Sequence, residues 1–126
     1  MKRSWIGLIL LVVLLAASLL VTWAMDRIHE PIARQLEQAA EAALDNDWAK
    51  AALLAGNSGT QWRKWAHFRG CFADHSPLEE IDAMFAQLEV YAAAEENAAF
   101  AASCAETARK VEAVGEAHGL VWWNLL

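Results

Sequence analysis

The sequence predicts an all-α protein in which an N-terminal transmembrane helix precedes a small antiparallel up-down bundle of about four helices. Three observations support this prediction. No charged side chain occurs from Ser4 to Met25. The remainder is rich in alanine, glutamate, leucine and glutamine, which favour helices. Its apolar residues recur at spacings of three and four, without the alternation that is typical of a half-buried strand.

The charge-free run is long enough to cross a bilayer. As a helix, residues 5–24 would extend about 30 Å, the thickness of the hydrocarbon core. Trp5 and Trp23 lie at its two ends, where indole rings favour the membrane–water interface. The small residues Ala16-Ala17-Ser18 would suit cleavage of a signal peptide. The apolar run continues to Met25, however, which favours an uncleaved anchor.

The flanking charges predict the orientation of this anchor. Lys2 and Arg3 directly precede the run, so the positive-inside rule places the N-terminus in the cytoplasm. We therefore expect a single-pass protein of the cell membrane. Residues 1–25 would form a cytoplasmic stub and transmembrane anchor, and residues 26–126 an extracytoplasmic helical domain.

The charge balance argues against nucleic acid as a partner. The formal net charge is −6, and 8 of the 10 basic residues and all 16 acidic residues lie after the anchor. The exported part therefore carries a formal charge of −8, which disfavours nucleic acid and flat docking on anionic lipid. Simple solubility explains this charge best.

The first helix of the domain is expected from Pro31 to Leu44, or as a continuation of the anchor that Pro31 kinks. An Asp-Asn-Asp turn at residues 45–47 would cap the second helix, which begins near Trp48. Two glycines at residues 56–59 cost roughly 1 kcal/mol each against alanine and could mark a loop. The apolar spacing continues across them, which favours one helix that reaches Phe72.

Ser76-Pro77-Leu78-Glu79 is typical of a capping box at the start of a third helix. A turn at residues 95–97 separates it from a fourth. Short turns imply up-down connectivity, which would bring the Asp74-His75 turn and the tail at residues 120–126 close to the bilayer. The tail could instead pack along the bundle. The expected apolar stripes of the first, third and fourth helices comprise Ile28, Ile32, Leu36, Ala39 and Ala43; Leu78, Ile81, Phe85, Leu88 and Ala92; and Phe100, Cys104, Thr107, Val111 and Val114.

After the anchor come an Asp-Trp-x-Lys-Ala turn at residues 47–51, a helix with Trp62 and Trp65, and a segment from Phe72 to Asp82. By these features the chain resembles the domain of unknown function 4363 family, small single-pass membrane proteins found largely in Firmicutes. The resemblance implies a recurring acidic and histidine motif, matched by Asp74, His75, Glu79 and Asp82, and no known activity. The glycines at residues 56–59 depart from the charged helix expected there.

Two groups of side chains are candidate sites. His67, Cys71 and His75 are spaced by four and could, with Asp74, bind Zn²⁺, although no paired ligand motif supports such a site. An aromatic stripe could grip a partner helix but is more often core. The candidate interaction residues are Trp62, Trp65, Phe68, Phe72, Trp122 and Trp123. The basic residues Arg63, Lys64 and Arg69 suit a solvated face, and Cys71 and Cys104 could pair or remain free thiols.

No motif places a catalytic nucleophile, and no glycine-rich phosphate loop is present in the sequence. We therefore expect no enzymatic activity and no cofactor. The sequence favours a membrane-anchored module that binds another membrane or envelope protein. The alternative is a tethered sensor for a ligand or a metal.

Overall fold

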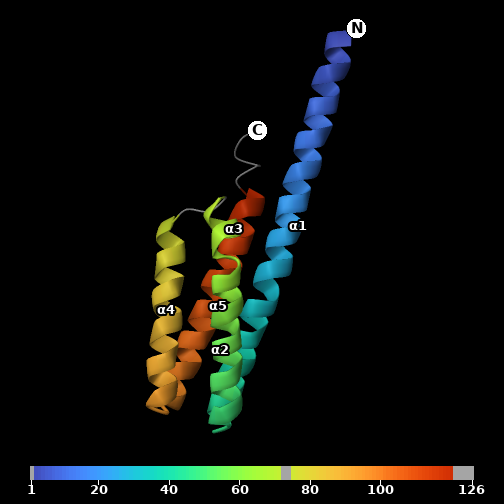
Figure 1. Ribbon diagram of the computed structural model, residues 1–126. Helices are drawn as coiled ribbons and strands as arrows, with labels where there is room; N and C mark the ends of the chain where they lie inside the picture. Colours follow the sequence, from blue (N-terminus) through green and yellow to red (C-terminus); the bar gives the residue numbers. More distant parts are fainter. Residues whose placement is uncertain (1, 72–74, 121–126) are drawn as a thin grey trace.

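The computed structural model describes residues 2–71 and 75–120, with only the backbone for residues 117–120. These residues form helices and no strand, as the sequence predicts (Figure 1). Five helices lie in the described part of the chain: α1 (Lys2–Leu44), α2 (Trp48–Lys64), α3 (Ala66–Gly70), α4 (His75–Ala93) and α5 (Asn97–Leu120).

Helix α1 is one continuous helix of 43 residues that includes both the apolar run and the first helix of the bundle. It continues through Pro31, so the predicted alternative of a continuous helix is confirmed and a separate start at Pro31 is wrong. A helix of this length extends about 65 Å. Among the described residues, α1 is the helix that is long and apolar enough to cross a membrane. None of the residues in its most apolar stretch is buried.

The other long helices surround the C-terminal half of α1. Helix α1 packs against α2 and α5, and α4 packs against α5 and α2, so α1 and α4 lie diagonally across a shared core. Successive long helices are antiparallel, which confirms the up-down bundle (Figure 1). We call the end from which α1 projects the near end; it holds α3 and the start of α4. The opposite end, with the turns at residues 45–47 and 94–96, is the far end.

Small side chains on α1 allow its neighbours to approach closely. Ala39 and Ala43 are fully buried, and the predicted stripes of α1, α4 and α5 face the core. The residues of α1 and α5 in the main buried cluster are Ile32, Ala33, Leu36, Ala39, Ala40, Ala42 and Ala43, and Phe100, Cys104, Ala108, Val111 and Val114. Because alanine loses no side-chain entropy in a helix, this face combines helix stability with close packing.

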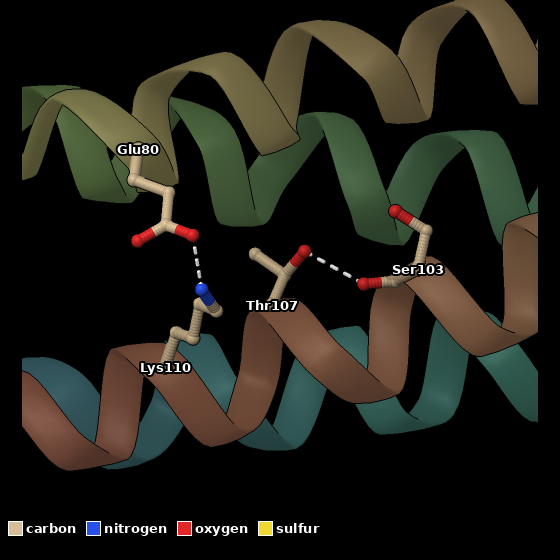
Figure 2. Close-up of polar contacts among 4 residues, drawn as sticks. All are labelled: Glu80, Ser103, Thr107 and Lys110. Atoms are coloured by element: carbon tan, nitrogen blue, oxygen red, sulfur yellow. Dashed lines mark hydrogen bonds and ion pairs between the residues drawn. The ribbon is translucent and has the colours of Figure 1, made fainter. Parts of the chain in front are cut away.

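Polar contacts accompany this packing between α4 and α5. Figure 2 shows Lys110 of α5 paired with Glu80 of α4. It also shows the buried Thr107, whose hydroxyl donates to the carbonyl oxygen of Ser103 at 2.7 Å. This hydrogen bond satisfies the Thr107 hydroxyl inside the core, where an unpaired hydroxyl would be costly.

Towards the near end of the core, α5 approaches the side chain of His29 on α1. A β-carbon at Gly115 would lie 3.4 Å from the β-carbon of His29, an ordinary van der Waals distance, so the two helices lie close together here. His29 is buried, and its Nδ1 lies 2.7 Å from the carbonyl oxygen of Met25, one turn earlier in α1. The His29 and Trp62 rings pack edge to face with their centroids 6.0 Å apart. His29 on α1 therefore contacts Trp62 on α2 and lies beside Gly115 on α5.

The far-end turns form as the sequence predicts. The Asp47 side chain accepts a hydrogen bond from the Lys50 amide at 3.2 Å and caps α2. Asn46 and Glu95 each adopt a positive φ, of 59° and 54°, which the tight turns require. The side-chain Nδ2 of Asn97 donates to Asn46 Oδ1 at 2.5 Å and joins the two turns.

Helix α2 is continuous through residues 56–59, which confirms the prediction of a helix rather than a loop. It does not reach Phe72, however, because it ends at Lys64 and Trp65 separates it from α3. Phe72 lies outside the described residues. Helix α4 begins at His75, so Ser76 lies in its first turn rather than before it, and the predicted capping position is wrong.

We predict that Gly56→Ala stabilises the bundle. A β-carbon at Gly56 would meet no atom within 4 Å, and the residue is exposed within α2. Alanine should therefore raise the free energy of unfolding by about 1 kcal/mol through its helix propensity. Urea unfolding of the full chain in detergent micelles measures this change. Ala52→Gly, one turn earlier on the exposed side of α2, is the matched control and should destabilise the bundle by a similar amount; an unchanged midpoint for both variants would contradict the argument.

Candidate functional site at the near end of the bundle

A cavity of about 400 Å³ opens at the near end, between the end of α2, α3 and the first turns of α4. Charged and titratable side chains from α3 and α4 line much of its wall. The lining includes Trp62, His67, Arg69, His75, Glu79 and Asp82. Side chains with a fixed charge or a titratable ring therefore converge here on one opening.

Arg69 is the central cation of this cavity. Its side chain is only 1% exposed, and its guanidinium lies 3.5 Å from the centroid of the Trp62 ring. Nη2 of Arg69 donates to the carbonyl oxygen of Trp62. Burial lowers the pKa of Arg69 to about 10, although the nearby charge of Asp82 acts in the opposite direction. The guanidinium is therefore charged at neutral pH in a place with little water.

Trp62 connects Arg69 to α4. Its Nε1 donates to Asp82 Oδ1 at 2.6 Å, while its ring carries the Arg69 guanidinium. Two further nitrogens of Arg69, Nε and Nη1, are buried and make no hydrogen bond to the described residues. Since a buried cation needs compensation, the negative charge of Asp82 and the π-face of Trp62 hold Arg69 in place.

The proposed metal ligands are only partly assembled. His67 and His75 line the same cavity, whereas Cys71 is exposed and its Sγ lies 3.4 Å from the carbonyl oxygen of His67. Asp74 lies outside the described residues. Among residues 2–71 and 75–120, no three histidine, cysteine, aspartate or glutamate side chains are grouped so that they could hold a metal ion.

The two cysteines are separate free thiols, so the open question of a disulfide is answered. Cys104 is buried within the core, and burial raises the pKa of its thiol to about 12. Cys71 is exposed at the near end, directly after α3.

The aromatic residues predicted to bind a partner have different environments. Trp62 is 1% exposed and belongs to the core, so it offers no surface to a partner. Trp65 is 39% exposed and Phe68 is half-buried, and their rings meet edge to face at 6.2 Å between centroids. Phe72, Trp122 and Trp123 lie outside the described residues.

Trp65 and Phe68 line a second opening, of about 450 Å³, where α1 leaves the bundle. Its other wall is α1 itself. The lining residues are Trp23, Ala24, Arg27, Ile28, Pro31, Gln61, Trp65 and Phe68. We call this opening the exit groove. Trp23, which ends the apolar run, is 57% exposed and stands next to the guanidinium of Arg27, 5.3 Å from its ring centroid.

An apolar groove of about 220 Å³ lies between α2 and α4. The small residues on its α2 side leave it open, and Arg63 and Glu89 carry opposite charges at its wall. The lining residues are Ala52, Ala55, Gly56, Gly59, Arg63, Phe85, Leu88, Glu89 and Ala92. The glycines that the sequence places in α2 therefore shape a surface rather than interrupt the helix.

Residues 20–125 match the sequence model of a family described as domain of unknown function (DUF4363). The chain belongs to the DUF4363 family. No curated protein and no solved structure matches the chain. Three of the residues to which the resemblance pointed, His75, Glu79 and Asp82, line the Arg69 cavity of this DUF4363 protein.

Sequence reasoning missed the burial of Arg69 and assigned it to a solvated face. The available signal was its position seven residues after Trp62, because two helical turns place such residues on one face. The positive charge of Arg69 outweighed this signal in the prediction, because charged side chains are rarely buried.

We predict an energetic coupling between Arg69 and Asp82. Asp82→Asn keeps an oxygen that can accept from Trp62 but removes the charge opposite Arg69, so it should lower the free energy of unfolding. In the background of Arg69→Met, the same substitution should cost less, with a coupling of about 1 kcal/mol. Urea unfolding of the four proteins at pH 7 completes the cycle. Glu89→Gln, also exposed on α4, is the control; strict additivity of Arg69→Met and Asp82→Asn would refute the coupling.

Proposed function

We propose that this DUF4363 protein is a single-pass membrane protein whose bundle lies outside the cytoplasm and binds another membrane or envelope protein. It acts by binding, without an enzymatic activity or a cofactor. The observation that supports this function is the continuity of α1, which supplies both an exposed apolar segment and a core helix of the bundle.

This continuity favours a tethered module over a free domain. A flexible linker would let a domain rotate away from its anchor, whereas a helix transmits its direction over its whole length. Here the bundle is packed around the C-terminal half of the same helix, so its surfaces keep a fixed orientation relative to the apolar segment. A bundle held at a fixed orientation to its anchor suits recognition of a partner in the same membrane.

We assign the partner to the groove between α2 and α4. Its wall is largely apolar, and the small residues of α2 leave it open. The side chains along one face of a partner helix would fit into it. Arg63 and Glu89 at this groove would fix the register of such a helix by their opposite charges. Helix α4 lies diagonally across the core from α1, so the groove includes a helix that does not contact the anchor helix extensively.

A ligand sensor at the Arg69 cavity is the second candidate. It is favoured by the two buried Arg69 nitrogens that make no hydrogen bond to the described residues, and by the two histidines that line the same cavity. A small carboxylate or phosphate would satisfy such donors. A bound anion would raise the thermal midpoint of the full chain, and this rise would be lost in Arg69→Met.

The orientation is testable by thiol labelling in intact cells. In a Cys71→Ser background, a cysteine introduced as Asp45→Cys at the far end should react with a membrane-impermeant maleimide. One introduced as Ser4→Cys should react only after permeabilisation. Cys104 should stay unlabelled in both cases until denaturation, because burial raises its thiol pKa to about 12. The opposite pattern of labelling would reverse the orientation.

Partner binding is testable by capture from cross-linked membranes. The full chain should retain a specific membrane or envelope protein, and Gly56→Phe should lose it because the new ring fills the α2–α4 groove. Asn57→Phe, exposed on the same helix but outside the groove lining, is the matched control and should retain the partner. Capture of nothing above background by the wild-type chain would remove the proposal.

A further inference from the structure

We propose that the near end of the bundle rests on the surface of the bilayer that α1 spans. In this arrangement the exit groove lies in the lipid headgroup layer, with Trp65 and Phe68 at the interface and nearby cations against lipid phosphates. The inference rests on the proposed membrane anchoring and adds a second membrane contact beyond the span itself.

The geometry of α1 determines the level of the groove. The apolar run ends at Trp23, and the helix continues without a break into the core of the bundle. Trp65 and Phe68 line one groove with Trp23 and Arg27, so they lie beside the point where α1 leaves its apolar segment. If the span places Trp23 at the membrane–water interface, the other two aromatic rings lie at that interface as well.

The exposed side chains have the chemistry of an interfacial belt. Trp23 and Trp65 are 57% and 39% exposed, although large apolar rings are costly in water. Indole combines an apolar body with an N–H donor, so it is stabilised where hydrocarbon meets headgroups. The groove between these rings, with its apolar wall, would accept the upper part of a lipid chain.

The charges near these rings differ from those of the domain as a whole. Residues 61–71 contain three basic residues and no acidic one, although the exported part carries a formal charge of −8. Arg69 is buried in its own cavity, which leaves Arg63 and Lys64 exposed on this segment. Lys64 lies 5.6 Å from the centroid of the Trp65 ring.

On α1, Arg27 stands in the same relation to Trp23 as Lys64 does to Trp65. Each cation is therefore placed beside a ring that prefers the interface, at the depth of lipid phosphates. Asp26 and Glu30 also lie on this part of α1, and Glu30 is paired with Arg34 at 2.5 Å. The start of α4 adds Glu79, Glu80 and Asp82 at the near end, where acidic and basic residues are therefore mixed. The two turns of the far end carry Asp45, Asp47, Glu95 and Glu96 without a basic residue.

A protein partner is a less fitting occupant of the exit groove. The groove is continuous with the apolar segment of α1, so lipid that surrounds the segment reaches the groove without a new interface. A partner protein or a second copy would have to displace that lipid. The positive charges of Lys64 and Arg27, which stand beside the Trp65 and Trp23 rings, also match the lipid phosphates at this level.

Depth-dependent quenching tests the inference on the full chain in vesicles of phosphatidylcholine and phosphatidylglycerol. A fluorophore is attached to the native Cys71, which is exposed directly after α3. Lipids with a nitroxide on the headgroup should quench it strongly. The same fluorophore at Asp45→Cys in a Cys71→Ser background should stay bright, since position 45 lies about 30 Å further along α1 than position 25.

A third label, at Leu14→Cys in the Cys71→Ser background, separates the two proposals. Quenching at position 14 by nitroxides deep in the acyl chains supports the anchor, and its absence overturns the anchor and the proposed function together. Quenching at position 14 without headgroup quenching at Cys71 retains the anchor and overturns the resting near end. Equal headgroup quenching at Cys71 and position 45 would mean that the bundle lies on its side, which also overturns the proposal that the near end rests on the bilayer.

Charge reversal tests the role of the cations. Lys64→Glu should reduce the headgroup quenching at Cys71 in anionic vesicles, with little change in pure phosphatidylcholine. Lys50→Glu, an exposed lysine near the far end, is the matched control and should leave the quenching unchanged. Shielding of Cys71 by a second copy or a partner would instead give no headgroup quenching for any of these proteins.

Discussion

The structure depends on a single constraint: one helix must satisfy two different surroundings along its length. The N-terminal half of α1 exposes large apolar side chains on all sides, whereas the C-terminal half buries a face rich in alanine against α2 and α5. The change occurs within one turn of Met25, the first buried residue of α1. Because no linker separates the two halves, the helices that pack on the C-terminal half of α1 have defined positions relative to its apolar segment.

At the near end, the bundle replaces apolar packing with a polar cluster. Arg69 is held between the π-face of Trp62 and the charge of Asp82, so α3 is fixed to α2 and α4 by a buried cation. The chain breaks at Trp65, between α2 and the short α3 that carries Arg69. Trp65 and Phe68 border this break and remain partly exposed, so the polar cluster and the two rings lie on neighbouring parts of one short segment.

The sequence predicts the periodic parts of this fold well and the near end poorly. Apolar stripes identify the buried faces of α1, α4 and α5, because residues three and four apart share a helix face. The apolar spacing continues through Trp65 and Phe68, however, so it predicts one helix where the structure has two. The spacing of seven residues from Trp62 indicates the face on which Arg69 lies, but no local pattern reports the compensating charge of Asp82, thirteen residues later in another helix. Among the candidate ligands, His67 and His75 converge on one cavity while Cys71 does not.

If the domain is anchored as proposed, its net charge is a poor guide to how it meets the bilayer, because the charges are distributed unevenly along its axis. Surface potentials fall off over about 10 Å at moderate salt. The far-end turns lie about 30 Å beyond the end of the apolar segment along α1, so their carboxylates are screened from a bilayer at that segment. Only the near end would lie within reach of the headgroups. There Arg27 and Lys64 stand beside Trp23 and Trp65, and Asp26, Glu30, Glu79, Glu80 and Asp82 supply carboxylates. An anionic surface would then attract the two cations beside the rings and would repel the acidic far end only weakly, which is compatible with an upright bundle on α1.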